Sequence, residues 1–570
     1  MENITNNDKI LLIIKKHALA NAISHDGKAF VGSVIGKIVA EDQSLKMRLG
    51  SLKEVIVSTV DFINSMSPDK QRFELEKISP EMLKKKKKQE KGLNELPNAI
   101  FGKVVTRIPP EPSKYLHVGH ALSFLINYLY AKKYDGKSVL RFEDTNPEKA
   151  TQEFVDSITE NILDYLEIVP EKILFVSDDV DKMYSLARSL VEKGQAYVCS
   201  CTQQEMHDLR EKGTACTCRS NDIKKNLSLW NDMLKGKFDD GERVLRLKID
   251  MKAKNAVMRD PVIFRIVKHE HYRQKNKFCV WPMYDFEAAI EEHLCGITHV
   301  LRSNEFGSMR VELQNYIRNL FGFENPTFVQ YGRFNIVGAI TEGRKIRQMI
   351  ENHEVFGWDD PRLVTLKALR RRGFVKEMYY ELVKEVGLSP TPTNIDWSLL
   401  NTTNRKIIDP ISKRYFFIED PVKIKVFGTP EKDVHLKFHP SDDKALKEFR
   451  INGTFYITRK DYNKIMGFDD GEPVRLIDCI NFTRKGNEFL FLSTDYADFK
   501  DKGNLIIHWL PDDKNNVPVK IVMPDISEVS GIGEKYLKNL KIGDIVQFQR
   551  FGFARFDSSE EGYVFYYTHN

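Results

Sequence analysis

The sequence predicts a multidomain α/β protein in which a doubly wound parallel sheet is followed by an all-β region. Strand and helix patterns alternate from residue 103 onward, which is typical of parallel sheets with crossover helices. After residue 397, short β-rich runs are separated by Gly, Pro, Asp and Asn, which is typical of antiparallel barrels. Residues 1–96 instead carry two amphipathic patterns, Leu11–Ile23 and Leu52–Ile63, and are predicted to form a helical extension. A chain of 570 residues has room for about four domains.

The pattern of residues 103–130 predicts a strand, a rigid loop and a helix. A β-branched run ending at Ile108 is followed by three prolines, and helical apolar spacing begins near His117. A helix start offers unpaired N–H groups and a positive dipole end to a phosphate, and Gly119 lets a flat ligand approach the backbone. His117 and His120 lie on one helix face and can donate hydrogen bonds to a leaving pyrophosphate. Two incidental histidines at a helix start would give the same pattern.

A second strand is predicted over residues 138–142, and it runs into the acidic pair Glu143 and Asp144. Thr145 and Glu148 have the spacing of a capping box, so we expect a helix to begin there. Ligands of doubly wound sheets bind at the carboxyl ends of the strands. Arg107, His117 and Glu143 are all expected at that edge.

Four of the seven cysteines form two close pairs: Cys199 with Cys201, and Cys216 with Cys218. Four soft ligands in two pairs suit a structural, tetrahedral Zn²⁺, with His207 as a spare ligand. The alternative is four reduced thiols in a loop. In either case a disulfide scaffold is not expected.

Composition limits the partners and the compartment. The net charge of +6 allows a nucleic-acid partner without requiring one. No apolar run is long enough to span a membrane and no signal-peptide pattern is present, so a cytoplasmic protein without a membrane partner is expected. The lysine run 84–88 fits either a solvated linker or a contact to RNA phosphates.

Several motifs together resemble one enzyme family. R-I-P-P-E-P-S-x-Y-L-H-V-G-H around His117 resembles the "HIGH" signature of class I aminoacyl-tRNA synthetases, with flanks like those of the glutamyl/glutaminyl branch. L-R-F-E-D-T-N-P, W-P-M-Y-D-F and G-I-T-H-V-L-R resemble further motifs of that branch. The β-rich C-terminus is similar to that of its archaeal-type glutamyl members, whereas bacterial glutamyl enzymes carry a helical region there.

The resemblance implies a domain order around a class I Rossmann-like catalytic domain. It is a helical N-terminal extension (1–96), the first catalytic half (97–173), an acceptor-binding insertion with the zinc site (174–278), the second catalytic half (279–339), a signature loop with a helical stem-contact region (340–396), and anticodon-binding barrels (397–570). Residues 370–372 are three consecutive arginines in the stem-contact region. They point to different sides of a helix, so at least one is expected to be structural.

The resemblance also implies the substrate residues. The glutamate site would consist of Arg107, Glu143, Tyr284 and Arg302. Arg302 decides the substrate, because a side-chain carboxylate needs a forked cationic donor and an amide does not. The ATP site would consist of Glu111, Ser113, His117, Gly119, His120, Ser303, Arg333, Phe334 and Lys345.

The second signature of the family, K-M-S-K-S, is not matched. Its usual catalytic lysine falls on Gly343 and its serine on Glu342, and a glutamate should repel phosphates. Arg344 and Lys345 are the expected substitutes, with His117 and His120 as the other catalytic residues. The alternative is a paralogue that binds tRNA but has lost the chemistry.

The predicted activity is the ATP- and Mg²⁺-dependent ligation of L-glutamate to tRNA(Glu) through a glutamyl-adenylate, by a monomer. Charging of tRNA(Gln) with glutamate stays open, and the resemblance implies that tRNA is often needed for the first step. The rival within the class is a glutaminyl enzyme. A small-molecule nucleotidyltransferase also shares H-x-G-H, but it would give the β-rich C-terminus no role.

Overall fold

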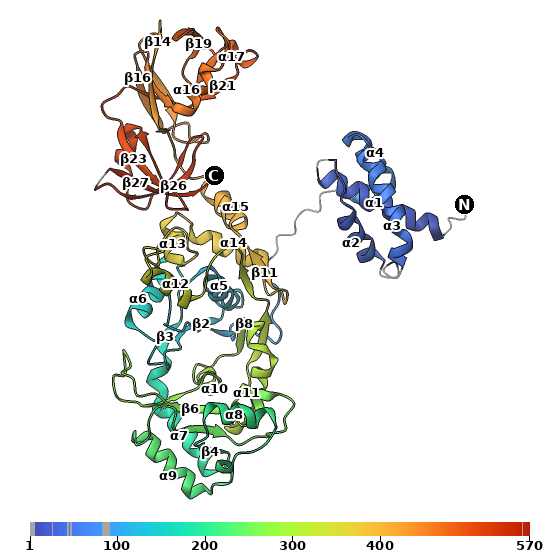
Figure 1. Cartoon of the computed structure of the whole chain (residues 1–570), viewed down its shortest axis with the longest axis vertical. Helices are drawn as coiled ribbons and strands as arrows, with labels where there is room; N and C mark the ends of the chain where they lie inside the picture. Colours follow the sequence, from blue (N-terminus) through green and yellow to red (C-terminus); the bar gives the residue numbers. More distant parts are fainter. Residues whose placement is uncertain (1–5, 26, 43–44, 46–47, 83–91, 561) are drawn as a thin grey trace. The chain divides into compact units, whose positions relative to one another are not determined.

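The computed structural model describes every residue except 1–5, 26, 43–44, 46–47, 83–91 and 561. The chain divides into two compact units, residues 1–91 and residues 92–570 (Figure 1). The predicted lysine run 84–88 lies outside the described residues. None of the described helices has the length and apolar character that a membrane span requires.

The first unit consists of helices packed on their own apolar core, and both predicted amphipathic helices are present. The helices are α1 (Asn6–Ser24), α2 (Val31–Glu41), α3 (Leu49–Asn64) and α4 (Pro68–Ile78). Ile14, Val34, Ile56 and other apolar side chains of these helices are fully buried against one another. Helix α4 begins with Ser67 as N-cap and Pro68 in its first turn, a favourable start for a helix.

The second unit is built on a parallel sheet that winds in two directions. Strand β1 (Val105–Ile108) pairs with β2 (Lys137–Phe142), and β2 pairs with β3 (Lys172–Phe175), all parallel. On the other side, β8 (His299–Ser303) pairs in parallel with β9 (Thr327–Tyr331). The Thr298 N–H donates to the Val105 carbonyl at 3.0 Å, which places β8 beside β1. The strand order is therefore β3-β2-β1-β8-β9. Successive strands are added on one side of β1 in the first half and on its other side in the second half, so the order reverses between β1 and β8.

Helices connect these strands as the doubly wound prediction requires, but one predicted helix start is wrong. The connecting helices are α5 (Val118–Lys133), α6 (Gln152–Glu160), α7 (Val180–Glu192), α10 (Tyr284–Leu294) and α11 (Gly307–Leu320). No helix begins at Thr145. Helix α6 begins at Gln152 with Thr151 as N-cap. The Thr145 hydroxyl instead donates to the buried Glu287 carboxylate, so a tertiary contact replaces the local cap.

The insertion between the two halves of the sheet has its own core around Trp230 and Phe264. Its antiparallel sheet consists of β4 (Ala196–Cys199), β5 (Val244–Leu247), β6 (Val262–Ile266) and β7 (Val280–Pro282). Helices α8 (Gln203–Glu211) and α9 (Ile223–Leu234) complete it. Within the second unit, the insertion lies on one side of the parallel sheet and helices α13 to α15 lie on the other (Figure 1).

The helical region after the sheet leads into the C-terminal strands. It consists of the parallel pair β10 (Phe334–Ile336) and β11 (Thr393–Ile395) and the helices α12 (Gly343–Glu351), α13 (Leu366–Arg371), α14 (Lys376–Val386) and α15 (Trp397–Ile408). Arg372, at the end of α13, is buried and donates to the Thr568 carbonyl at 2.9 Å. The prediction of at least one structural arginine in 370–372 is confirmed.

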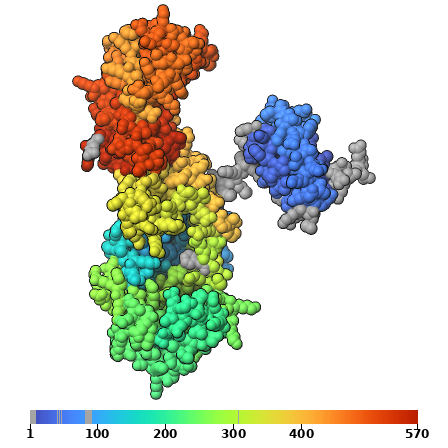
Figure 2. All heavy atoms as spheres, in the orientation of Figure 1, coloured from blue at the N-terminus to red at the C-terminus, as the bar shows by residue number. Residues whose placement is uncertain are grey.

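The C-terminal region is β-rich, as predicted, and consists of two seven-stranded sheets in adjacent volumes, one largely red and one orange in Figure 2. The first contains β12 (Arg414–Tyr415), β25 (Ile545–Phe548), β26 (Gly552–Ser558), β27 (Tyr563–His569), β23 (Val517–Val522), β24 (Glu528–Gly533) and β13 (Phe417–Glu419), in that order. The second contains β21 (Leu505–Ile507), β18 (Val474–Leu476), β19 (Asn481–Lys485), β20 (Glu488–Ser493), β14 (Pro421–Phe427), β17 (Thr454–Thr458) and β22 (Leu510–Pro511). A hairpin of β15 (Lys432–Lys437) and β16 (Leu446–Ile451) and the helices α16 (Arg459–Met466) and α17 (Ala497–Lys500) accompany the second sheet.

Candidate active site

Helix α5 follows the carboxyl end of β1, and its first turn holds the two predicted histidines. His117 is the N-cap, and its Nδ1 accepts a hydrogen bond from the Gly119 N–H at 3.0 Å. His120 Nδ1 in turn accepts from the His117 N–H at 3.1 Å. The ring centroids lie 3.9 Å apart. Because each Nδ1 is an acceptor, each neutral imidazole carries its proton on Nε2, and both Nε2–H groups are left as donors.

Both imidazoles are neutral at physiological pH. Burial lowers the pKa of His117 to about 3, and the charges of Lys114 and Arg333 act in the same direction. Burial, together with His117 and Lys114, also lowers the pKa of His120 well below its usual value. The histidines can therefore donate hydrogen bonds to a phosphate, but the positive charge that offsets the phosphate must come from other groups.

A cavity of about 460 Å³ opens at this edge of the sheet. Four of the predicted substrate residues line it: Glu111, His120, Glu143 and Tyr284. Further polar side chains on its wall were not predicted, namely Lys114, Thr145, Asn146, Arg265 and Glu287. The fold brings three segments together here, 109–124, 143–146 and 265–287, and no local sequence pattern reports that proximity.

Arg302 lies on β8, only 4% exposed, and it contacts the tyrosine that lines the cavity. Its Nη1 donates to Gln314 Oε1 at 3.1 Å, and its guanidinium lies 5.0 Å from the centre of the Phe328 ring. Burial lowers the pKa of Arg302, and a hydrogen bond with Tyr284 opposes that shift. The buried guanidinium of Arg302 is therefore in contact with Tyr284, a residue of the cavity wall.

Arg107 lies on the neighbouring strand β1 and is almost fully buried. Its Nη1 donates to the Leu301 carbonyl at 3.3 Å, and its Nε lies 3.6 Å from a Glu292 carboxylate oxygen. The charges of both arginines oppose the effect of burial, which raises the pKa of Tyr284. The two predicted guanidiniums therefore converge on the same tyrosine.

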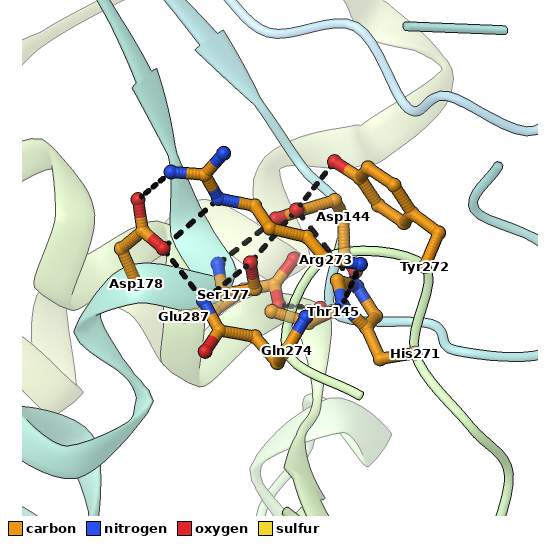
Figure 3. Close-up of polar contacts among 9 residues, drawn as sticks. All are labelled: Asp144, Thr145, Ser177, Asp178, His271, Tyr272, Arg273, Gln274 and Glu287. Carbon is orange, nitrogen blue, oxygen red and sulfur yellow. Dashed lines mark hydrogen bonds and ion pairs between the residues drawn. The ribbon is translucent and has the colours of Figure 1, made fainter. Parts of the chain in front are cut away.

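A buried network holds the loop that carries Glu143 (Figure 3). Asp144 is fully buried and accepts hydrogen bonds from the Ser177 N–H and hydroxyl, both at 2.8 Å, and from the Tyr272 hydroxyl at 2.9 Å. His271 Nε2 lies 2.7 Å from the Asp144 carbonyl. The network joins the β2 loop to the segment between β6 and β7, so it fixes the loop against the insertion.

Glu143 lines the cavity, and its carboxylate accepts a hydrogen bond from Arg141 Nη2 at 2.9 Å. Burial and the charge of Glu143 raise the pKa of the neighbouring Glu287 well above its usual value. The Glu143 carboxylate lies on the cavity wall, where it can bind a cation such as an α-ammonium group.

The residues predicted from the second signature lie beside this cavity rather than on its wall. Lys345 pairs with Glu342, and Arg344 is exposed. Neither is among the described residues that line the cavity. The structure instead places Lys114 over Gly343: a β-carbon at Gly343 would lie 3.1 Å from Cβ and Cδ of Lys114.

Four other predicted ATP residues, Ser113, Ser303, Arg333 and Phe334, do not line the cavity wall. Ser303 accepts from the Glu305 N–H at 3.4 Å, and Arg333 pairs with Glu305 at 2.8 Å. Phe334 lies against Tyr331 with a ring distance of 5.5 Å, and the carbonyl of Ser113 accepts from Arg347 at 2.9 Å.

A larger cavity of about 1040 Å³ adjoins the first. The two share Arg265, Met283 and Tyr284 on their walls. Most other lining residues come from the insertion and include several arginines, among them Arg210, Arg246 and Arg259. Carboxylates, among them Glu148, Glu211 and Asp285, line the same wall, so the larger cavity carries charges of both signs.

The four cysteines of the insertion come together as predicted. Their sulfur atoms all lie within 4.8 Å of one another, and Cys199 Sγ and Cys216 Sγ are 3.8 Å apart. Four thiolates at about 2.3 Å from a zinc ion have sulfur–sulfur distances of about 3.8 Å. Arg246 Nη1 lies 3.8 Å from Cys199 Sγ and 3.9 Å from Cys216 Sγ. His207, the spare ligand, is not part of the group.

The fold and the site together define a nucleotide-binding α/β protein, because a helix start with two imidazole donors lies where the strand order reverses. Residues 103–410 match the family described as tRNA synthetases class I (E and Q), catalytic domain. Residues 412–490 and 506–557 match its anti-codon binding domains. The chain belongs to this family of class I tRNA synthetases for glutamate (E) and glutamine (Q).

Its curated relatives extend this similarity along the whole chain. A glutamate–tRNA ligase from Methanothermobacter thermautotrophicus is 37% identical over 98% of this chain and 99% of its own length. Glutamate–tRNA ligases from Pyrococcus abyssi and Methanocaldococcus jannaschii are 39% and 36% identical, over 98% and 99% of this chain and 99% and 100% of their own lengths.

Proposed function

We propose that this protein attaches L-glutamate to tRNA in an ATP-dependent reaction that passes through a glutamyl-adenylate. The observation that carries the proposal is the buried Arg302 guanidinium, which contacts Tyr284 at the wall of the cavity that also holds Glu143 and His120. A guanidinium there favours a carboxylate over a neutral amide. The names of the relatives agree with this substrate.

In the first step a glutamate α-carboxylate oxygen attacks the α-phosphorus of ATP. The bond to the bridging oxygen of the β-phosphate breaks, and its electron pair leaves with pyrophosphate. Glu143 binds the α-ammonium group, and Arg302 and Arg107 bind the side-chain carboxylate. The Nε2–H groups of His117 and His120 donate to phosphate oxygens as charge develops there. Catalysis requires no protein nucleophile, only positioning and charge stabilisation.

ATP arrives as its Mg²⁺ complex, and the metal offsets part of the phosphate charge. Of the remaining predicted ATP contacts, Arg333 and Phe334 lie near the start of α5, and Ser303 stays a prediction. Arg344 and Lys345 stay predictions, because they reach the phosphates only if the first turn of α12 moves.

In the second step a terminal ribose hydroxyl of tRNA attacks the carbonyl carbon of the adenylate, and AMP leaves. The cavity of about 1040 Å³ is the proposed path of the tRNA end, because it shares Tyr284 and Arg265 with the proposed glutamate pocket. The C-terminal sheets would bind the anticodon. A structural Zn²⁺ held by Cys199, Cys201, Cys216 and Cys218 would stabilise the insertion and would leave no open coordination position.

The test is ATP–pyrophosphate exchange with tRNA(Glu) present, run with glutamate and with glutamine. Exchange that depends on glutamate supports the proposal. Exchange with glutamine alone would favour a glutaminyl enzyme, and no exchange with either amino acid would favour a tRNA-binding paralogue. Charging of purified tRNA(Glu) and tRNA(Gln) then defines the tRNA range, and light scattering tests the predicted monomer.

A further inference from the structure

Lys114 lies between the start of α5, which carries the two histidines, and the start of α12 at Gly343. No established motif assigns it a role. It belongs to the loop after β1, three residues before the His117 N-cap. Its side chain is half-buried and lines the cavity together with His120 and Glu143. Its charge reaches both imidazoles, because it contributes to the lowered pKa of each.

Three other cations near the start of α5 already have partners, and Arg344 is exposed and does not line the cavity. Lys345 pairs with Glu342, Arg333 pairs with Glu305, and Arg347 donates to the Ser113 carbonyl. Among the described residues, by contrast, Lys114 has no carboxylate partner and no hydrogen-bond acceptor. An ammonium group that is half-buried on a cavity wall gains most from an anionic ligand.

Helix α12 leaves room for this lysine because its first residue has no side chain. A β-carbon at position 343 would lie 3.1 Å from Lys114 Cβ and from Cδ. Arg347 anchors α12 to the same loop through Ser113, so the helix start and the Lys114 stem are held against each other. The second signature of the family normally places a lysine at this position. Here the position is Gly343, and the side chain of Lys114 packs over it.

We propose that Lys114 supplies the ammonium group that contacts the ATP phosphates. Because Gly343 has no side chain, it leaves room for this lysine. The inference rests on the proposed function and concerns its first step. When the bond between the α-phosphorus and the bridging oxygen breaks, the electron pair stays on pyrophosphate. Lys114 donates hydrogen bonds to those oxygens and remains protonated throughout. The neutral histidines supply donors, and Lys114 supplies charge.

The experiment compares glutamate-dependent exchange in full-length wild type, Lys114→Met and the control Lys103→Met. Lys103 is an exposed lysine of the same segment, so its variant removes the same charge outside the site. We expect the kcat of Lys114→Met to fall about 100-fold, the usual cost of one charge-stabilising donor. We expect the KM for glutamate and the melting temperature to stay at the wild-type values, and Lys103→Met to stay within about 2-fold of wild type.

A position swap tests the geometry. Gly343→Lys alone should be impaired, because the new side chain pushes against the Lys114 stem. The double variant Gly343→Lys, Lys114→Gly should exchange at least about 10-fold faster than Lys114→Gly alone. Recovery supports the inference, and a double variant no better than Lys114→Gly contradicts it.

Failure of the inference can be told apart from failure of the proposed function. An active wild type with Lys114→Met within about 3-fold of it overturns the role of Lys114 alone. A larger loss in Lys345→Met than in Lys114→Met also overturns it and assigns the charge to Lys345. A wild type that exchanges with neither amino acid overturns the proposed function, and the inference with it.

Discussion

Glu143 and Asp144 are neighbours in the chain, but their carboxylates have opposite environments. Glu143 faces the cavity, whereas Asp144 is fully buried and bound by Ser177 and Tyr272. A cavity carboxylate can bind a substrate cation, and a saturated buried carboxylate cannot. Glu143 is therefore the proposed ligand of the substrate, and Asp144 supports the loop that carries it.

In the proposed function, the choice of glutamate over glutamine depends on Arg302. Replacement of Arg302 by Gln should raise the KM for glutamate about 100-fold, because a charge-assisted hydrogen bond contributes about 1.5–3 kcal/mol. Steady-state exchange at varied glutamate measures it, and the KM for ATP, which should not change, serves as the internal control. An unchanged KM for glutamate would show that this guanidinium does not bind the side-chain carboxylate.

The buried histidines make stability depend on pH. Burial lowers the pKa of His117 to about 3 and the pKa values of His508 and His569 to about 4. In the unfolded chain these groups titrate near 6.5, so between the two values only the unfolded state binds their protons. Their contribution is present above about pH 6.5 and is lost as the pH falls toward the folded-state pKa values.

The measurement is the melting temperature between about pH 8 and pH 5. His508→Gln should show a shallower decrease below about pH 6.5 than wild type, whereas His269→Gln, at an exposed position, should follow wild type. Equal slopes in all three proteins would mean that His508 titrates alike in the folded and unfolded chains.

At the scale of elements, the segment between β6 and β7 connects the insertion to the catalytic sheet. Figure 3 shows His271, Tyr272 and Gln274 from this segment converging on Asp144 and Ser177. Arg273 adds an ion pair with Asp178 at 2.7 Å. Because that pair is exposed, it contributes little, and Asp144 carries most of the coupling.

Asp144→Ala should therefore destabilise the protein by about 3 kcal/mol, because it leaves the buried Ser177 and Tyr272 donors without their acceptor. Asp144→Asn keeps the shape and should cost less. Denaturant titration followed by tryptophan fluorescence measures both, and the KM for glutamate should rise in Asp144→Ala as the Glu143 loop loosens. A loss in Asp144→Ala no greater than in Asp144→Asn would contradict a structural role for this carboxylate.

The four cysteines lie at the end of β4 and in a neighbouring loop of the insertion, with their sulfur atoms within 4.8 Å of one another. We expect about one zinc per chain, as in other four-cysteine sites. Cys216→Ser should lose the metal and lower the melting temperature, and a chelator should do the same to wild type. Metal analysis by mass spectrometry checks the stoichiometry, with Cys479→Ser, a cysteine outside the cluster, as the matched control. Wild type purified in zinc without bound metal would contradict the site.

At the scale of the whole molecule, the second unit is continuous from the site to the C-terminal sheets. Arg371 on α13 pairs with Asp557 on β26 at 2.9 Å, and Arg372 donates to the Thr568 carbonyl on β27. Arg550 ties the two C-terminal sheets by pairing with Asp461 on α16 at 2.6 Å. These contacts connect the C-terminal sheets to each other and to helix α13.

The first unit has its own core, and the active-site cavity is lined by residues 109–287 alone. A chain of residues 92–570 should therefore fold and retain glutamate-dependent exchange within about 2-fold of full length. Residues 1–91 alone should give a helical spectrum and a cooperative melt by circular dichroism. Loss of exchange in a folded 92–570 fragment would mean that the first unit completes the site.

Prediction from sequence succeeded where the signal is local and failed where distant segments compete. The α5 start, the parallel strands, the cysteine group and the C-terminal strands all follow from periodicity, turn residues or motifs. Thr145 and Glu148 look like a capping box, but the Thr145 hydroxyl bonds Glu287, which lies 142 residues away. The motif around His117 assigns no role to Lys114, and its proposed role follows only from its packing over Gly343.

The chain of residues alone determined the kind of fold, the edge of the sheet where ligands bind and the family, because these depend on spacing along the backbone. Tertiary structure alone decided that Asp144 is buried and bound by Ser177 and Tyr272, and that Lys114 packs over Gly343. The reason is physical: burial, pKa and free volume belong to the surroundings of a side chain, and those surroundings come from segments far apart in the sequence.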